Sequence, residues 1–314
     1  MKILGIDAGG THSRAAVVDE NGNLLALSHG GPSNFRDIGI DEFLKRISSL
    51  VDSLNIDRKT FDSAFVGVSG MGFKKGDREY FAALLSKVIS AKRIGVVNDC
   101  HAALIGAIAP KDTGICIISG TGNMTIGISK DGKVYRAGGW GHLLGDPGSA
   151  FGLSYEAFKV ALKTVEKREN AFKIAKVFQE EFGIVDLDDY LEFFYSSKSK
   201  SKLASIAPKI VELAKSGDKH SERLVLKQIK EIVDQVIAVS KAVKSNYISY
   251  SGGMFKSEYF KKKLREELLN HGFELVKPTL LPLGGAIVMG ISEIRDVNEE
   301  LVNNIKSWIW SVES

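Results

Sequence analysis

The fold of this chain is decided by the stretch Ile3-Leu4-Gly5-Ile6-Asp7-Ala8-Gly9-Gly10-Thr11-His12-Ser13. It begins as a buried strand, loses its side chains at Gly9 and Gly10, and continues into the apolar run Ala15-Ala16-Val17-Val18. Adjacent glycines between strands indicate a tight turn whose N–H groups a phosphate can approach closely. Because Asp7 would repel a phosphate unless a cation lay between them, the stretch predicts Mg²⁺ at Asp7. An ordinary hairpin with a glycine turn is the alternative.

The same pattern recurs in the second half of the chain. Residues 114–128 read as a strand, the turn Gly120-Thr121-Gly122 and a second strand. Each copy then runs into a hairpin signal, which is Asn21-Gly22 in the first and Asp131-Gly132 in the second. The chain is therefore predicted to consist of two related halves, each offering a glycine-rich tip. Two such tips facing each other would grip a polyphosphate from both sides.

Composition limits the class of protein. The 314 residues leave room for two domains, and a chain that is 44% hydrophobic and 25% charged is ordinary for a globular protein. The net charge of +4 is scattered, so we expect no nucleic-acid partner. No apolar run reaches membrane-spanning length and no signal-peptide pattern opens the chain, so we expect a cytoplasmic protein without a membrane partner. The two cysteines, Cys100 and Cys116, are expected to be buried free thiols.

A carboxylate follows the buried strand Ile94-Gly95-Val96-Val97. This strand runs directly into Asn98-Asp99, and the helix formers Ala102-Ala103-Leu104 come next. Open α/β sheets bind ligands beyond the carboxyl ends of their strands, which places Asp99 where a ligand is expected. Asp99 could instead only cap the helix. Because Asn98 is available as the cap, we favour a functional role for Asp99.

The most unusual segment is Gly138-Gly139-Trp140-Gly141-His142-Leu143-Leu144-Gly145-Asp146-Pro147-Gly148-Ser149-Ala150-Phe151-Gly152. A plain linker rarely carries tryptophan, whereas a loop that shapes a pocket often does. His142 could be a metal ligand or a base, but a lone loop histidine more often only forms hydrogen bonds. Residues 154–245 then have a helical pattern throughout, and Tyr247–Tyr250 is a short strand that leads into Ser251-Gly252-Gly253, a third glycine turn.

The remaining apolar patterns predict helices over 40–54, 80–89 and 301–309, a small-residue helix from Leu283, and strands over 61–69 and 273–276. The order of strands and helices argues against a plain Rossmann unit. The first loop lacks GxGxxG spacing, and no Walker Gly-Lys-Ser/Thr occurs.

Five motifs in this order resemble the sugar kinase/actin/Hsp70 superfamily and, within it, the N-acetylglucosamine kinase and BadF/BadG ATPase group. The segments that carry the resemblance are Gly5–Thr11, Asn98-Asp99, Ile118–Asn123, Gly138–Ala150 and Ser251–Phe255. The resemblance covers nearly the whole chain. It implies an actin-like, ribonuclease H-like α/β ATPase fold with two domains, a central cleft and a helical elaboration in the second. The expected domains are 1–111, joined by the C-terminal helix 296–314, and 112–295, with the helical insertion at about 154–245.

The resemblance also implies roles for single residues. ATP would bind with its phosphates between the turns Gly9-Gly10-Thr11 and Gly120-Thr121-Gly122, and Gly252 and Gly253 would let its adenosine approach the backbone. Asp7 would hold Mg²⁺, and Asp99 would accept the proton of the attacking sugar hydroxyl. The sugar-binding residues would be Asn34, Asp99, Trp140, Gly141 and Asp146. A homodimer is implied as well.

The chain also departs from the pattern of the family. Members often have Asp-Glu-Gly-Ser-Ala-Tyr-Trp where this chain has Asp146-Pro147-Gly148-Ser149-Ala150-Phe151-Gly152. Pro147 removes a carboxylate and a backbone donor, and Gly152 removes a bulky aromatic side chain. The zinc-binding cysteines of ROK-type sugar kinases and the iron–sulfur cysteine segment of dehydratase activators are both absent.

Three functions are compatible with these residues. The leading one is an ATP-dependent kinase acting on the 6-hydroxyl of a hexosamine or hexose, with N-acetylglucosamine first among them. The second is a BadF-type ATPase that activates a partner, which the missing cysteine segment disfavours. The third is a sugar sensor or actin-like interaction protein without useful turnover, which would not need both Asp7 and Asp99.

Overall fold

The computed structural model describes residues 1–56, 60–196 and 199–313, and divides the chain into two compact units. Unit 1 comprises Met1–Cys116, Lys130–Gly132 and Lys277–Ser314, and unit 2 comprises Ile117–Ser129 and Lys133–Val276. The sequence pattern predicts residues 277–295 in the second domain, whereas the structure groups them with unit 1. The reason is that helix α12 (Pro282–Ser292) packs against strand β1 and helix α4 of unit 1.

Unit 1 is built on a sheet with the strand order β3-β2-β1-β5-β7. Its strands are β1 (Ile3–Ala8), β2 (Ser13–Val18), β3 (Leu24–Gly30), β5 (Ser63–Val68) and β7 (Ile94–Asn98). β2 pairs with β1 on one side and with β3 on the other, and both pairs are antiparallel hairpins as predicted. β1, β5 and β7 run parallel. Asp7 lies opposite Gly67, and Val68 lies opposite Asn98. The carboxyl ends of the three parallel strands therefore meet at one edge of the sheet.

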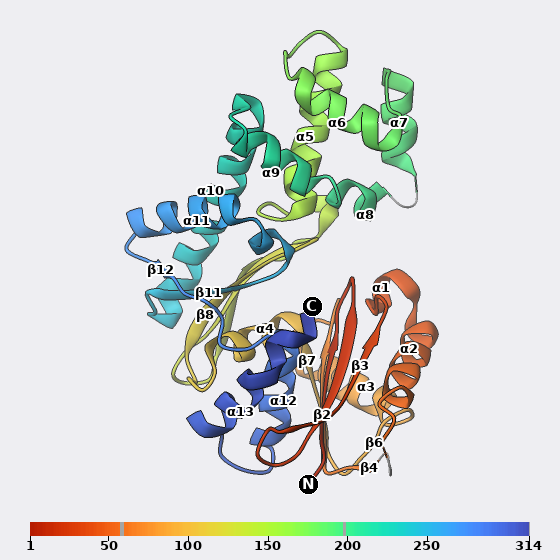
Figure 1. The fold of residues 1–314 in the computed structure, drawn as a ribbon, viewed down its shortest axis with the longest axis vertical. Coiled ribbons are helices and arrows are strands. Elements are labelled where there is room, and N and C mark those ends of the chain that lie inside the picture. Colours follow the sequence, from red (N-terminus) through yellow and green to blue (C-terminus); the bar gives the residue numbers. More distant parts are fainter. Residues whose placement is uncertain (57–59, 197–198, 314) are drawn as a thin grey trace. The chain divides into compact units, whose positions relative to one another are not determined.

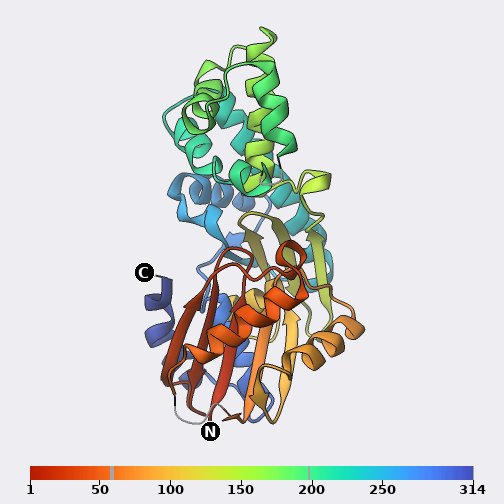
Figure 2. The ribbon, with the colours of Figure 1, turned by 90° about the vertical axis from the view of Figure 1, so that its right-hand side faces the viewer.

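Helices cover both faces of this sheet (Figure 1). They are α1 (Phe35–Ile38), α2 (Ile40–Asp52), α3 (Lys75–Leu85), α4 (Asp99–Ile108), α12 and α13 (Glu299–Ile309), with a short turn η3 (Trp310–Glu313) and the strand pair β4 (Thr60–Phe61) and β6 (Ser90–Ala91). Alternating strand residues face opposite cores, because Leu4 and Ile6 pack with α2 and α3 while Ile3 packs with α12 and α13. Figure 2 shows α2 lying across the sheet. The predicted helix over 80–89 ends at Leu85, and the predicted strand over 61–69 is divided between β4 and β5.

Helices α4 and α12 cross very closely at their glycines. A Cβ atom on Gly285 would lie 1.8 Å from the carbonyl oxygen of Ala102, and one on Gly106 would lie 2.6 Å from that of Leu281. Only residues without a side chain allow the two backbones to approach in this way. The crossing matters for function because α4 begins at Asp99.

Gly285→Ala is expected to lower the free energy of unfolding by about 1–3 kcal/mol or more, because the new methyl group cannot fit without moving one helix. Gly76→Ala is the matched control. Gly76 lies in α3 and has open space around its Cβ position, so alanine should stabilise that helix by up to about 1 kcal/mol. Thermal unfolding of the parent and of both variants checks the prediction. Equal melting temperatures of Gly285→Ala and Gly76→Ala would contradict the close crossing of α4 and α12.

Unit 2 has a sheet with the strand order β10-β9-β8-β11-β12 and a large set of helices. The strands are β8 (Gly114–Ser119), in which the chain passes from unit 1 to unit 2, β9 (Asn123–Ile128), β10 (Val134–Gly138), β11 (Tyr247–Ser251) and β12 (Glu274–Leu275). The helices are α5 (Ala150–Val165), α6 (Phe172–Phe182), α7 (Leu187–Tyr195), α8 (Ser199–Ala204), α9 (Ala207–Lys215), α10 (Lys219–Val243) and α11 (Glu258–Asn270), with the short turns η1 (His142–Leu144) and η2 (Gly253–Lys256). Helices α5 to α10 thus fill the stretch predicted as helical.

The two units contain similar strand–turn–strand motifs. In each of them a glycine turn joins two neighbouring strands, with Gly9-Gly10 between the antiparallel pair β1 and β2 and Gly120-Thr121-Gly122 between β8 and β9. Within the described residues, no helix is long and apolar enough to cross a membrane.

Candidate active site

The candidate site residues of unit 1 gather at the carboxyl edge of its sheet. β1 ends beside Asp7, which is 7% exposed, β5 leads into Ser69, and β7 leads into Asp99 at the first position of α4. A Cβ atom on Gly67 would lie 3.4 Å from the Cα atom of Asp99, so the start of α4 rests directly on β5. Because Gly67 pairs with Asp7, the sheet brings Asp7 and Asp99 to the same edge.

The turn after β1 is sterically limited to glycine at its first position. A Cβ atom on Gly9 would lie 2.6 Å from the carbonyl oxygen of His12. The Gly9 carbonyl accepts a hydrogen bond of 2.9 Å from the backbone N–H of Ser33, and the Ser33 and Ser13 hydroxyls are 2.8 Å apart. Ser13 therefore holds the turn through its contact with Ser33, whereas Thr11 is exposed on the turn.

Asn34 is held next to the segment that follows β5. Its Oδ1 caps helix α1 by accepting from the backbone N–H of Arg36 at 3.1 Å, and the Arg36 Nε donates to the Gly70 carbonyl at 2.6 Å. Gly70 has a φ of +81°, and a Cβ atom there would lie 2.4 Å from the Asn34 Oδ1. The loop with Asn34 is thus locked to the edge of the sheet that carries Asp99.

Asp99 is not the cap of its helix. Asn98 takes that role, since its Oδ1 accepts from the Cys100 backbone N–H at 2.9 Å while its Nδ2 donates to the Met71 carbonyl at 2.5 Å. Asp99 Oδ1 accepts a hydrogen bond of 3.0 Å from the Cys100 N–H. Burial raises the pKa of Asp99 above its ordinary value, although hydrogen-bond donors at Ser69 and Cys100 oppose the shift.

The raised pKa of Asp99 gives a pH dependence. A carboxyl that accepts a proton works only when it is ionised, so we expect kcat to fall as the pH falls through the pKa of Asp99. Because that pKa lies above the usual aspartate value near 3.8, the decline should begin at a higher pH than for an exposed aspartate. A profile of kcat against pH at saturating substrates measures it. A rate that stays flat down to pH 4 would contradict the role of Asp99 as a proton acceptor.

In unit 2 the second glycine turn is tied to the start of α5. The Gly120 carbonyl accepts from the Ala150 N–H at 2.8 Å, and the Thr121 carbonyl accepts from the Phe151 N–H at 3.3 Å. The third glycine turn lies beside it, because a Cβ atom on Gly252 would lie 2.4 Å from the Ser119 carbonyl oxygen. The space at the Cβ position of Gly253 is open. The second phosphate motif and the expected adenosine motif are therefore neighbours.

Asp146 is turned toward the same glycine turn. Its backbone has a φ of +40°, and its Oδ2 would lie 2.7 Å from a Cβ atom on Gly122. Burial raises the pKa of Asp146, against hydrogen bonds from the backbone N–H groups of Asn123 and Gly141. Among the described residues, its buried Oδ1 has no hydrogen-bond partner. Trp140, from the same loop, is 60% exposed, so its ring is available to a ligand.

Two glutamines of α10 support this loop, and neither is among the site residues predicted from the sequence. Gln228 Oε1 accepts from the Gly148 N–H at 2.7 Å, and Gln235 Oε1 accepts from Asn123 Nδ2 at 2.8 Å. Both side chains are buried. Both glutamines lie on the buried, apolar face of α10, where a polar side chain needs a hydrogen-bond partner. A polar residue at these positions interrupts the 3.6-residue repeat of apolar residues, and this interruption is the sequence signal that could have revealed them.

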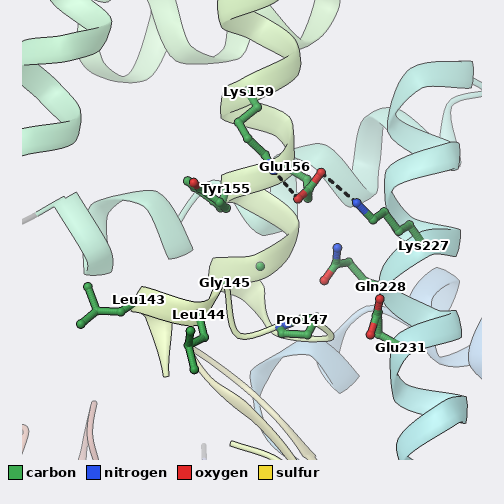
Figure 3. Close-up of a pocket in the computed structure, with 11 residues that line it drawn as sticks. Leu143, Leu144, Gly145, Pro147, Tyr155, Glu156, Lys159, Lys227, Gln228 and Glu231 are labelled. Carbon is green, nitrogen blue, oxygen red and sulfur yellow. Dashed lines mark hydrogen bonds and ion pairs between the residues drawn. The ribbon is translucent and has the colours of Figure 1, made fainter. Parts of the chain in front are cut away.

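A cavity of about 390 Å³ is lined by the Gly138–Gly152 loop and by helices α5 and α10 (Figure 3). Pro147 and Gly152, the two departures from the family pattern, both line it. Glu156 is bound there by Lys159 at 2.6 Å and by Lys227 at 3.1 Å. A Cβ atom on Gly152 would lie 2.7 Å from the Asp146 carbonyl oxygen, so the loop occupies the space into which a larger residue would extend.

His142 stands at the rim of the loop and makes an edge contact with the ring of Phe151, with the ring centres 5.8 Å apart. The described residues contain no group of three or more His, Cys, Asp or Glu side chains placed to hold a metal ion.

Comparison with known proteins agrees with this arrangement. The chain is 27% identical to an N-acetyl-D-glucosamine kinase of Dictyostelium discoideum, over 92% of this chain and 97% of that protein. It is also 27% identical to an N-acetylmuramic acid/N-acetylglucosamine kinase of Clostridium acetobutylicum, over 88% of this chain and 92% of the relative. The structure of a candidate N-acetylglucosamine kinase from Chromobacterium violaceum superposes with a TM-score of 0.74 at 21% identity, covering 92% of this chain and 98% of that one. These neighbours confirm the predicted actin-like sugar kinase fold. Since residues 4–290 match the profile of the BadF/BadG/BcrA/BcrD ATPase family, the chain belongs to that family.

Proposed function

We propose that this protein is an ATP-dependent sugar kinase that transfers the γ-phosphoryl group of ATP to the 6-hydroxyl of a hexosamine or hexose, with N-acetylglucosamine as the foremost acceptor. The observation that carries the proposal is the position of Asp99. A carboxyl that burial makes more basic stands at the same sheet edge as Asp7 and the Gly9-Gly10 turn. Both curated relatives that cover most of the chain are named as kinases of N-acetylglucosamine, which supports the same acceptor.

Phosphoryl transfer depends mainly on positioning and on neutralising charge. The turns Gly9-Gly10-Thr11 and Gly120-Thr121-Gly122 bind the phosphates of ATP through their backbone N–H groups and threonine hydroxyls. Gly253, with open space at its Cβ position, lets the adenosine approach the backbone, whereas Gly252 is required by its packing on Ser119. Asp99 accepts the proton of the sugar hydroxyl and orients its oxygen toward the γ-phosphorus.

The residues present fit a magnesium ion. Mg²⁺ usually keeps several waters and is held by one or two carboxylates together with substrate phosphates, so a cluster of protein ligands is not needed. Asp7 supplies one carboxylate beside the phosphate turn. Its Oδ2 lies 4.0 Å from the Nη1 of Arg14. Bound there, the ion would neutralise phosphate charge.

The sugar is bound by polar groups that point to its hydroxyls. Asp146 offers a buried oxygen without a protein partner among the described residues, which is an acceptor for a hydroxyl donor. Asn34 uses its Oδ1 for the helix cap, so its amide nitrogen is the group that donates to the sugar. The exposed ring of Trp140 and the backbone of Gly141 complete the set.

A panel assay of ATP consumption tests this function. ATP turnover should rise on addition of N-acetylglucosamine, and the product should carry phosphate on its 6-oxygen, which NMR identifies. Glucose, glucosamine, N-acetylmannosamine and N-acetylmuramic acid form the rest of the panel. Turnover that is independent of every sugar would instead indicate a BadF-type activating ATPase, and a protein that binds ATP and sugar without turnover would be a sensor.

A homodimer is part of the proposal. In unit 2, α7 exposes Leu187, Leu191 and Tyr195, which are spaced four residues apart and so share one helix face. This apolar stripe supports association between copies. Light scattering of the parent protein should give twice the monomer mass of 34.2 kDa. The mass measured for Leu191→Glu should be lower than that of the parent.

A further inference from the structure

We propose that Gln235, on helix α10, is a positioning residue for sugar binding, because it holds through Asn123 the loop that carries Asp146. The inference rests on the proposed function, in which Asp146 binds a sugar hydroxyl, and adds a residue to it. Gln235 is buried and is connected to both ends of the Gly138–Gly152 loop. Its effect on the sugar is indirect, since it acts through that loop.

The backbone around Asp146 needs support from outside. Asp146 has a φ of +40° and Gly148 has a φ of +88°, so both lie in the left-handed region. A residue with a side chain adopts this region uncommonly, and it persists where surrounding groups impose it. Pro147, between the two, has no N–H to donate. The conformation at Asp146 therefore depends on partners for the other backbone groups of this segment.

Buried side chains of unit 2 supply those partners. The Pro147 carbonyl accepts from Asn123 Nδ2 at 2.9 Å. The Gly148 N–H donates to Gln228 Oε1 at 2.7 Å, and the Gly148 carbonyl accepts from the Ser119 hydroxyl at 2.6 Å. All three side chains are buried, and they come from α10 and from the two strands that flank the second glycine turn. The framework of unit 2 thus fixes the backbone that follows Asp146.

Gln235 determines how the amide of Asn123 is turned. The Asn123 nitrogen has two hydrogens, of which one goes to the Pro147 carbonyl and the other to Gln235 Oε1 at 2.8 Å. The same Gln235 oxygen accepts from the Thr125 hydroxyl at 3.3 Å, so two donors of β9 occupy its lone pairs. Without this acceptor, the Asn123 amide keeps one hydrogen bond instead of two and is free to rotate away from Pro147.

The other end of the loop rests on Gln235 directly. A Cβ atom on Gly138, whose φ is +77°, would lie 2.8 Å from Gln235 Oε1. Between the two ends, Asp146 Oδ2 lies 2.7 Å from the position of a Cβ atom on Gly122, the last residue of the second glycine turn. Asn123 is the next residue after that turn. Gln235 therefore sets where the Asp146 carboxyl lies relative to the turn that binds phosphate.

The phosphate turn has supports of its own. The Gly120 carbonyl accepts from the Ala150 N–H at 2.8 Å, and the Gly120 N–H donates to the Gly122 carbonyl at 2.9 Å. Loss of Gln235 should therefore weaken the binding of sugar and leave the binding of ATP. A lost interaction that served the ground state and the transition state equally appears in KM, with kcat little changed.

Gln235→Leu removes the acceptor at similar side-chain volume. We expect the KM for N-acetylglucosamine to rise about 10- to 100-fold, the effect of leaving a buried donor unpaired, while the KM for ATP and kcat stay near the parent values. Gln235→Glu keeps an acceptor oxygen and should restore most of the sugar affinity. Gln179→Leu, the same change at an exposed glutamine of α6, is the matched control and should keep both parent KM values. Equal rises in both KM values of Gln235→Leu would overturn the proposal.

A second measurement needs no turnover. The chain has three tryptophans, of which Trp140 lies in the loop, two residues after Gly138, while Trp308 and Trp310 belong to unit 1. In ¹⁵N NMR spectra, Gln235→Leu should shift the indole signal of Trp140 and leave the other two in place. An unchanged Trp140 signal would overturn the proposal, because the loop would not depend on Gln235. So would shifts of all three signals, which would show a general loss of structure.

A double-mutant cycle decides whether Gln235 acts through Asn123. Asn123→Ala should raise the sugar KM by itself, and adding Gln235→Leu should raise it little further, because the two residues act as one unit. Full additivity of the two losses would contradict the proposed route. If the parent enzyme shows no sugar-dependent turnover, the proposed function fails by itself, and the Trp140 signal still decides whether Gln235 holds the loop.

Discussion

Asp99→Asn is expected to lower kcat by about 10²- to 10⁴-fold while the affinity for ATP stays close to that of the parent. Asparagine has nearly the same shape and keeps an oxygen for the Cys100 N–H donor. It cannot accept the proton of the sugar hydroxyl, so the loss should appear in the chemical step. Steady-state kinetics with N-acetylglucosamine and a titration with ATP measure the two effects separately.

Stability separates this loss from misfolding. Because burial raises the pKa of Asp99, its neutral form is favoured in the folded state, and the stability it provides is lost as the pH rises through that pKa. At neutral pH the neutral asparagine should therefore leave the melting temperature equal to or above that of the parent. Asp41→Asn, an exposed aspartate in the first turn of α2, is the matched control and should keep the parent kcat. A fully active Asp99→Asn enzyme would remove Asp99 from the mechanism.

Local signals predicted much of the fold of each unit. Asn21-Gly22 and Asp131-Gly132 both occur at the predicted hairpin turns, between β2 and β3 and between β9 and β10. The run Ile94-Gly95-Val96-Val97 ends in Asn98 as strand β7, and Asp99 opens α4 as predicted. These features depend on residues that are adjacent in the chain, so that their physical cause is visible in a short segment of sequence.

Features that depend on distant residues were not predicted. The grouping of residues 277–295 with unit 1 depends on the contact of Gly285 with Ala102, which are more than 180 positions apart. The hydrogen bond from the Ser69 N–H to the Ala8 carbonyl likewise becomes visible only when β5 is placed beside β1. The roles of Asp7, Thr121 and Asp146 remain predictions, since the structure fixes their surroundings and not their ligands.

Gly10→Val is expected to weaken ATP binding by about a hundredfold or more, because it blocks the face of the turn whose N–H groups bind phosphate. A Cβ atom on Gly10 has space, with Ser69 Oγ at 3.4 Å as its nearest neighbour, and Gly10 is exposed. The two methyl groups of valine extend beyond that position, and β-branching leaves them little freedom to turn away. The fold should therefore survive while the phosphate site is lost, which calorimetric titration with ATP measures.

The choice of position sharpens this experiment. At Gly9 even alanine would meet the His12 carbonyl oxygen at 2.6 Å, so a Gly9 variant would disturb the turn itself and could not separate folding from binding. Gly76→Val on α3, with open space at its Cβ position, controls for introducing valine into unit 1. Adenosine carries no phosphate, so its binding should be equal in Gly10→Val and in the parent. Tight ATP binding by Gly10→Val would show that the first glycine turn is an ordinary hairpin, which is the alternative the sequence left open.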